Sequence, residues 1–127
     1  MHYLLDTHSF LWFINGDKAL SKIARTSIED NSSVKYISIA SFWEISIKLC
    51  IGKLKLDFPY DELKDQVVEN GFEILPITFE HTSKLASLKF IHKDPFDRMI
   101  IAQAIIENLS VISKDRNFQH YAIKQIW

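Results

Sequence analysis

The sequence His92-Lys93-Asp94-Pro95-Phe96-Asp97-Arg98 runs directly into an apolar segment and combines acids, bases and a helix start within one turn. Asp94 followed by Pro95 is typical of a helix start, because an aspartate oxygen accepts an otherwise unpaired backbone N–H and proline loses nothing at the first helical position. Asp97 then falls one turn later, near Asp94. Two carboxylates at the positive end of a helix are either favourable caps or part of a cation site. The rest of the sequence is needed to choose between them.

Length and composition predict one globular domain over residues 1–127. A chain of 127 residues is long enough for one hydrophobic core and too short for two ordinary domains. Its 47% hydrophobic and 24% charged residues exclude a disordered or fibrous protein. No apolar run reaches membrane-spanning length and no signal peptide is evident, so we expect a cytoplasmic protein without membrane association. Cys50, the single cysteine, lies in an apolar helical pattern and is predicted to be a small core residue.

The net charge limits how the chain could bind nucleic acid. A formal net charge of -1 excludes binding through overall charge, because proteins that bind in this way are clearly basic. Any nucleic-acid contact must therefore come from a local patch of cations. Scattered lysines are also ordinary on a solvated surface. The candidates for such a patch are Lys48, Lys53, Lys55, Lys89, Lys93, Arg98, Lys114 and Arg116.

Periodicity and turn signals predict short strands separated by helices. Strands are expected at residues 2–5, 34–38, 72–77, 110–113 and 123–127. Helices are expected at residues 7–14, 21–30, 39–51, 61–70, 78–88 and 95–108, with one or two helical turns at 116–121. This alternation predicts an α/β domain in which a mainly parallel sheet carries helices on both faces, a three-layer α/β/α arrangement.

Acidic side chains lie where the predicted strands end. In an open parallel sheet, ligands bind beyond the carboxyl ends of the strands. Asp6 directly follows the first strand, and Asp115 closely follows a later one. Glu44 lies about a turn into the helix after the second strand, and Asp94 and Asp97 open the helix that leads to the strand before Asp115. Four separate elements therefore deliver carboxylates to the same edge of the sheet.

Each acid also has an ordinary structural interpretation. Asp97 suits the dipole of its helix, and burial of Glu44 among apolar neighbours is costly unless a partner such as Lys48, four residues on, pairs with it. Three acids are suitable caps for the helices that follow them: Asp6, Asp94 and Asp115.

A cluster of these acids would favour a hard cation. Clustered carboxylates repel one another unless protons or a cation intervene. An oxygen donor set without cysteines or paired histidines favours Mg²⁺ or Mn²⁺ over zinc. His8 and His92 lie nearby in the sequence as candidate ligands, general acids or RNA contacts, although a lone histidine more often has none of these roles.

Four motifs carry a resemblance that spans essentially the whole chain. They are Leu4-Leu5-Asp6-Thr7-His8, Ser41-Phe42-Trp43-Glu44-Ile45, Asp94-Pro95-Phe96-Asp97-Arg98-Met99-Ile100-Ile101-Ala102-Gln103-Ala104 and Ile112-Ser113-Lys114-Asp115. In this order and spacing, the chain resembles a PIN-domain ribonuclease, and more closely the VapC toxins of type II toxin–antitoxin systems. The motif that contains Asp97 is the specific one, whereas an aspartate after a first strand is not.

The resemblance implies a Mg²⁺- or Mn²⁺-dependent endoribonuclease with a single PIN domain, which hydrolyses RNA by metal-activated water. The catalytic acids that it implies are Asp6, Glu44, Asp97 and Asp115. Of these, three are implied as metal ligands: Asp6, Asp97 and Asp115. Supporting or substrate-binding roles fall to Thr7, Asp94, Ser113, Arg98, Lys93 and Arg116. Ser113 stands where family members commonly carry threonine, so the hydroxyl is kept.

The resemblance also implies protein partners. Toxins of this kind usually form homodimers and are neutralised by a cognate antitoxin. The apolar segments 10–14 and 39–51 are candidate surfaces for these partners, and ordinary core is the alternative interpretation of both.

Three other functions fit parts of the pattern. One is a PIN nuclease that processes RNA without an antitoxin, and another is a PIN scaffold that binds RNA without cutting it. The third is a phospho-accepting receiver domain, which is also α/β with a strand-end aspartate and Mg²⁺. A receiver needs its phosphoacceptor at the end of a central apolar strand, and Asp57, in a lysine-rich linker, does not meet that requirement.

Overall fold

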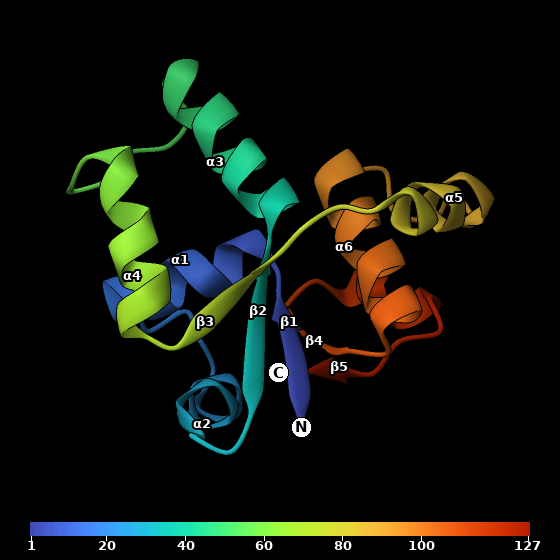
Figure 1. The fold of residues 1–127 in the computed structure, drawn as a ribbon, viewed down its shortest axis with the longest axis horizontal. Helices are drawn as coiled ribbons and strands as arrows, with labels where there is room; N and C mark the ends of the chain where they lie inside the picture. The colour runs from blue at the N-terminus through green and yellow to red at the C-terminus, as the bar shows by residue number, and fades with distance from the viewer.

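Five short strands form a single, entirely parallel sheet in the order β3-β2-β1-β4-β5 (Figure 1). The structure is a computed structural model that describes residues 1–127. The strands are β1 (His2–Leu5), β2 (Val34–Ser38), β3 (Phe72–Leu75), β4 (Ser110–Ile112) and β5 (Gln125–Ile126). The predicted parallel sheet is therefore confirmed. Its third strand is shorter than expected, because Pro76 has no N–H for the sheet ladder.

The helices lie within a few residues of their predicted positions. They are α1 (Thr7–Asn15), α2 (Lys22–Glu29), α3 (Ile39–Cys50), α4 (Leu63–Glu69), α5 (Phe79–Ser87) and α6 (Pro95–Glu107). The structure also has two 3₁₀ turns, η1 (Tyr60–Glu62) and η2 (Arg116–His120). The second lies where one or two helical turns were predicted, at residues 116–121. The helix expected at 61–70 thus begins as the 3₁₀ turn η1 and becomes α-helical only at Leu63.

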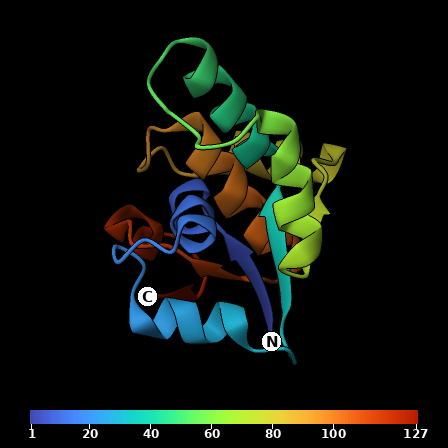
Figure 2. The ribbon, with the colours of Figure 1, turned by 90° about the vertical axis from the view of Figure 1, so that its left-hand side faces the viewer.

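The sheet has a hydrophobic core on each face, which gives the predicted three-layer α/β/α arrangement (Figures 1 and 2). Alternation along β1 divides its side chains, because successive residues of a strand point to opposite faces. Leu5 belongs to a core cluster of 14 buried residues that includes side chains of α1, α2, α3 and α4. Leu4 belongs to a cluster of 8 buried residues that α6 and η2 complete. No helix is long and apolar enough to span a lipid bilayer.

The strand order reverses beside β1. The chain adds β2 on one side of β1 and β4 on the other, so the carboxyl ends of β1 and β4 form a topological switch point, where open α/β sheets bind ligands. Receiver domains have the strand order 2-1-3-4-5. The order observed here differs from it, and Asp57 is exposed in a loop between α3 and η1. The receiver interpretation is therefore wrong.

The two apolar segments that were candidate surfaces have different environments. In α1, Phe10 and Leu11 are buried, and the next three residues pack against the same core. In α3, by contrast, an apolar strip remains exposed. It consists of Ile39, Trp43, Ile47 and Ile51. The first segment is thus ordinary core, whereas the second offers an apolar surface.

The prediction that Cys50 is a core residue is wrong. Its side chain is exposed at the end of α3. The buried residues of α3 end at Ile45, and five further positions rotate Cys50 away from the face that carries Ile45. The segment is apolar around much of its circumference, so composition alone did not show which face meets the sheet.

We expect the substitution Phe10→Ala to destabilise the protein by about 3–5 kcal/mol, as is typical for removal of a buried ring. Phe10 is fully buried, and its ring centroid lies 5.8 Å from that of Phe42 and 5.7 Å from that of Phe72. Urea unfolding would measure the loss. Phe79→Ala is the matched control, since Phe79 is 83% exposed and its loss should change stability by no more than about 0.5 kcal/mol. Equal effects of the two substitutions would contradict this description of the core.

Candidate active site

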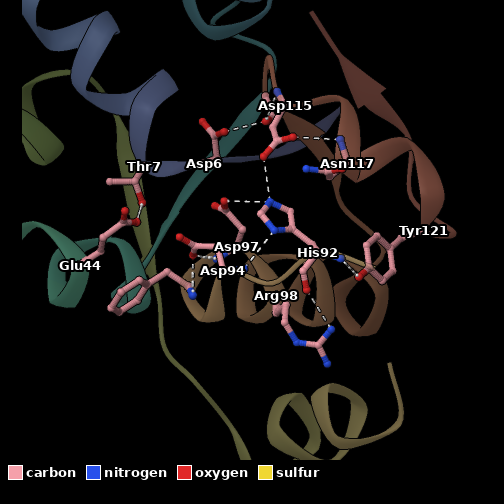
Figure 3. Close-up of polar contacts among 12 residues, drawn as sticks. Asp6, Thr7, Glu44, His92, Asp94, Asp97, Arg98, Asp115, Asn117 and Tyr121 are labelled. Atoms are coloured by element: carbon pink, nitrogen blue, oxygen red, sulfur yellow. Dashed lines mark hydrogen bonds and ion pairs between the residues drawn. The ribbon is translucent and has the colours of Figure 1, made fainter. Parts of the chain in front are cut away.

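Carboxylates from four elements meet at the switch point of the sheet (Figure 3). Asp6 follows β1 and Asp115 follows β4, while Glu44 comes from α3 and Asp97 from the first turn of α6. Asp94 immediately precedes α6 and lies beside Asp97. The structure therefore brings together the four acids that the strand-end argument placed at one edge.

Mutual repulsion in this cluster acts most strongly on Asp97. Burial, the largest cause, and the nearby charges of Asp94, Asp6, Glu44 and Asp115 together raise the pKa of Asp97 from its usual 3.8 to about 8. Removal from water and like charges both disfavour the ionised form of a carboxyl group. Near neutral pH, the Asp97 carboxyl group is thus largely protonated unless a cation compensates for its charge.

Asp6 is both a helix cap and a member of the cluster. Its Oδ1 accepts the backbone N–H of Ser9 at 2.8 Å, which caps α1, and its Oδ2 accepts the hydroxyl of Ser113 at 2.6 Å. Burial raises the pKa of Asp6, and the hydrogen bonds from Ser113 and Ser9 partly oppose that shift. The two interpretations of Asp6 are thus compatible, because capping fixes the carboxylate at the sheet edge.

Glu44 is buried and held at both oxygens. The Thr7 hydroxyl donates to its Oε1 at 2.7 Å, and the Lys48 ammonium lies 2.6 Å from its Oε2. The hydroxyl of Ser41 lies 2.9 Å from the Thr7 oxygen. The i,i+4 pair with Lys48 is confirmed, and it does not remove Glu44 from the site, since the charge of Glu44 is one of those that raise the pKa of Asp97.

Asp115 caps the 3₁₀ turn η2 and is linked to Asp6. Its Oδ1 accepts the N–H of Asn117 at 2.9 Å. Its own N–H donates to the Ser113 hydroxyl at 3.0 Å, and that hydroxyl donates in turn to Asp6. Gln125 holds the turn by donating to the carbonyls of Ser113 and Asp115 at 2.7 and 2.8 Å. Ser113 therefore connects the acids that follow β1 and β4.

Asp94 is confirmed as the cap of α6. Its Oδ1 accepts the N–H groups of Phe96 at 2.9 Å and of Asp97 at 3.0 Å. Among the neighbouring charges, that of Asp94 also raises the pKa of Asp97 most. The stretch 92–98 thus combines helix-starting chemistry with the electrostatics of the site.

His92 lies inside the cluster, which the sequence left undecided. The Nε2 of this buried ring is 2.8 Å from Oδ2 of Asp115 and 3.1 Å from Oδ2 of Asp97. His8 is exposed, and its ring is 5.7 Å from that of Trp12 rather than among the acids. In the sequence each histidine lies two residues from a capping aspartate, His8 after Asp6 and His92 before Asp94, so spacing alone did not distinguish them.

The basic residues proposed to bind phosphate differ in their surroundings. The guanidinium of Arg98 donates to the carbonyls of Lys89 at 3.0 Å and of His92 at 3.3 Å, and it stacks over the ring of Phe90 at 4.9 Å. It therefore holds the loop before α6. Lys93 and Arg116 are exposed and pair with no acid, so they remain the predicted phosphate contacts.

The donor set fits a hard divalent cation. One ligand atom from each of His92, Asp97 and Asp115 lies within 4.8 Å of the other two. Oxygen donors dominate, as Mg²⁺ and Mn²⁺ prefer, and positive charge would relieve the repulsion that raises the pKa of Asp97. Asp97 and Asp115 would hold it; Asp6 and Glu44 are not part of this close group, although their charges act on Asp97.

A model of the PIN domain matches residues 3–124 of the chain. The chain belongs to the PIN-domain family. No curated protein sequence matches it. The sequence-based resemblance to PIN domains is thus confirmed, and the all-parallel sheet with helices on both faces is its PIN fold.

Several solved structures share this fold. VapBC2 from Rickettsia felis, bound to a DNA fragment from its promoter, aligns with a TM-score of 0.73 at 18% identity over 98% of this chain and 97% of that one. VapBC-1 from nontypeable Haemophilus influenzae aligns with a TM-score of 0.67 at 18% identity over 98% and 96%. The PIN domain endonuclease Utp24 aligns with a TM-score of 0.52 at 18% identity over 93% and 74%. At these identities the likeness shows a common fold.

The raised pKa of Asp97 predicts how pH affects the metal-free protein. The native state holds the Asp97 proton more tightly than the unfolded chain does, so stability falls as pH rises from 3.8 to about 8. The contribution of one group is at most about 1.4 kcal/mol per pH unit. Asp97→Asn should remove this contribution and be more stable than wild type near pH 7.

Urea unfolding with a chelator present, compared at about pH 5 and about pH 7, measures this difference. Asp57→Asn is the control, because Asp57 is exposed and outside the cluster. Parallel pH profiles for wild type and Asp97→Asn would show that Asp97 does not titrate in this way.

Proposed function

We propose that this PIN domain is a metal-dependent endoribonuclease and the toxin of a type II toxin–antitoxin system. The observation that carries the proposal is the convergence of four carboxylates at the switch point, which together with burial raises the pKa of Asp97 to about 8. Such an arrangement costs stability in the metal-free protein. A requirement for a cation accounts for it.

The roles of the acids follow from their contacts. A Mg²⁺ or Mn²⁺ ion supplies a hydroxide nucleophile at neutral pH and neutralises charge on the phosphate. Asp6, Asp97 and Asp115 would hold the ion, and Asp97 would give up its proton on binding it. Glu44 is fixed by Thr7 and Lys48, so its carboxylate needs no reorganisation to face the same space.

Exposed cations beside the acids support RNA as the substrate. Lys93 precedes Asp94, and Lys114 and Arg116 flank Asp115, and all three side chains are exposed. Contacts between these groups and phosphates would make RNA affinity salt-dependent although the net charge is only -1. Hydrolysis by an activated water leaves a 5′-phosphate and a 3′-hydroxyl.

The toxin assignment rests on a separate set of observations. The structures of VapBC2 and VapBC-1 align with nearly the full length of the chain. The apolar strip on α3, formed by Ile39, Trp43, Ile47 and Ile51, is a surface on which an antitoxin or a second copy of the chain would bury apolar area. The fold of the endonuclease Utp24 supports the alternative, a PIN nuclease without an antitoxin.

We expect the purified protein to cleave structured RNA in Mg²⁺ or Mn²⁺ and to lose this activity with a chelator. Asp97→Asn should lower the cleavage rate by more than about 100-fold, because loss of a ligand should exceed the 10- to 100-fold effect typical of groups behind the ligands. Asp57→Asn, outside the cluster, should cleave like wild type. Gel analysis of end-labelled RNA measures both the rate and the ends.

A 2′,3′-cyclic phosphate in the products would contradict hydrolysis by an activated water. RNA binding that survives Asp97→Asn, together with no cleavage by wild type under any metal condition, would favour the non-cutting scaffold instead.

Expression in bacteria tests the toxin assignment independently. Wild-type protein should arrest growth, Asp97→Asn should not, and co-expression of a small adjacent gene should restore growth to cells that express wild type. RNA cleavage in vitro without growth arrest, or the absence of an adjacent gene whose product neutralises the protein, would contradict the toxin assignment. The nuclease assignment would still stand.

A further inference from the structure

We propose that His92 is a positioning residue that holds Asp115 beside Asp97 through its Nε2–H, and that it does not ligate the cation. This inference rests on the proposed metal site. The Nε2 of His92 lies 3.1 Å from Oδ2 of Asp97 and 2.8 Å from Oδ2 of Asp115, so it is placed either to ligate a cation beside them or to donate a hydrogen bond. The other ring nitrogen distinguishes the two roles.

Nδ1 of His92 faces a donor. The backbone N–H of Asp94 points at this nitrogen with an N···N distance of 3.2 Å. A backbone N–H can only donate, so Nδ1 carries no proton and accepts this bond. A neutral imidazole then carries its proton on Nε2, and Nε2–H donates to Oδ2 of Asp115, while Oδ2 of Asp97 lies 3.1 Å from the same nitrogen.

A metal-ligating histidine has the opposite arrangement. Its second ring nitrogen usually donates its N–H to a carboxylate or carbonyl oxygen, which keeps the ligating nitrogen unprotonated. If Nε2 of His92 were to bind a cation, Nδ1 would have to carry the proton and would meet the N–H of Asp94, donor against donor. The backbone N–H of Asp94 therefore selects the tautomer that donates from Nε2.

The loop before α6 is built to hold this ring. The Tyr121 hydroxyl accepts the N–H groups of His92 at 2.8 Å and of Ile91 at 3.2 Å and donates to the carbonyl of Lys89 at 2.9 Å. The guanidinium of Arg98 donates to the carbonyls of Lys89 and His92 from the other side. The side chains of Tyr121 and Arg98 thus hydrogen-bond the backbone of three loop residues, which are Lys89, Ile91 and His92.

Packing fixes the plane of the ring as well. The His92 ring packs edge-on against Phe118 with centroids 5.6 Å apart, and Phe118 is fully buried in the core beneath η2. With its backbone held by Tyr121 and its ring held by Phe118, His92 presents Nε2–H at a fixed point between the two aspartates (Figure 3).

This hydrogen bond has a direct consequence for the acids. Asp115 lies on a short 3₁₀ turn and its side chain is 34% exposed, so the turn alone does not fix it against repulsion from Asp97. The Nε2–H group donates to Oδ2 of Asp115 and lies 3.1 Å from Oδ2 of Asp97, so it offsets the repulsion between the two carboxylates when both are ionised. His92 thereby keeps Asp97 and Asp115 close enough to hold one ion.

Manganese binding tests the proposal directly. Titration of Mn²⁺ followed by electron paramagnetic resonance gives the affinity of wild type, His92→Ala and His92→Gln. We expect His92→Ala to weaken binding by about 10- to 100-fold, the usual effect of removing a group behind the ligands. His92→Gln keeps an N–H donor near the position of Nε2, so its affinity should stay within a few-fold of wild type.

Pulsed resonance on the Mn²⁺-loaded protein separates the two roles of His92. We expect no hyperfine coupling from a directly bound imidazole nitrogen in wild type. Such a coupling, lost in His92→Ala, would overturn the proposal, as would His92→Ala with wild-type affinity. His120→Ala is the matched control, since His120 is exposed at the end of η2 and should leave the affinity unchanged.

Two further measurements keep the outcome interpretable. Circular dichroism and metal-free thermal unfolding check that His92→Ala is folded. If His92→Ala is not folded, Tyr121→Phe replaces it. That variant keeps the His92 side chain and removes only the hydroxyl that holds the loop, so it should also weaken Mn²⁺ binding.

Asp97→Asn distinguishes failure of the His92 proposal from failure of the metal site. Undiminished Mn²⁺ affinity in this variant would overturn the metal site itself, and with it the role of His92.

Discussion

Repulsion among carboxylates is the constraint on which this site depends. Asp97 is partly buried at the point where charges from three other elements converge, and its pKa rises to about 8 as a result. An ordinary helix start would not need this arrangement, because one capping acid at Asp94 already satisfies the first N–H groups of α6. The protein thus maintains an unfavourable electrostatic state that a bound cation would relieve.

The surrounding hydrogen bonds show how the fold keeps that state in place. Asp6 is held by Ser113, Glu44 by Thr7 and Lys48, and the Asp97–Asp115 pair by His92. Most of these donors link two acids that lie on different elements. Ser113, near Asp115 in sequence, donates to Asp6, and Thr7, next to Asp6, donates to Glu44. Lys48 is the exception, because it lies on the same helix as Glu44. The backbone order of the sheet brings the acids together, and these side chains fix their orientation.

Much of the site could be predicted from the sequence because strand ends and helix caps are local signals. Asp6, Asp94 and Asp115 are caps as expected, and the rule for parallel sheets places their elements at one edge. The role of His92 was not predictable in this way, since its partner Asp115 lies 23 positions away in the chain. Cys50 was misplaced because α3 is apolar around much of its circumference. The hydrogen bonds from Arg98 to loop carbonyls could not be predicted either, because they depend on the conformation of the loop before α6, which sequence periodicity does not reveal.

The double use of capping aspartates limits which substitutions could remove the proposed activity and leave the fold intact. Replacing Asp6 or Asp115 by alanine would remove an N-cap, which costs about 1 kcal/mol in a typical helix. Asparagine or serine would keep the cap and abolish the negative charge. A relative that kept the fold but lost catalysis should therefore carry asparagine or serine at these positions. Such a polar substitution would distinguish an inactive relative from a protein that never had the acidic cluster.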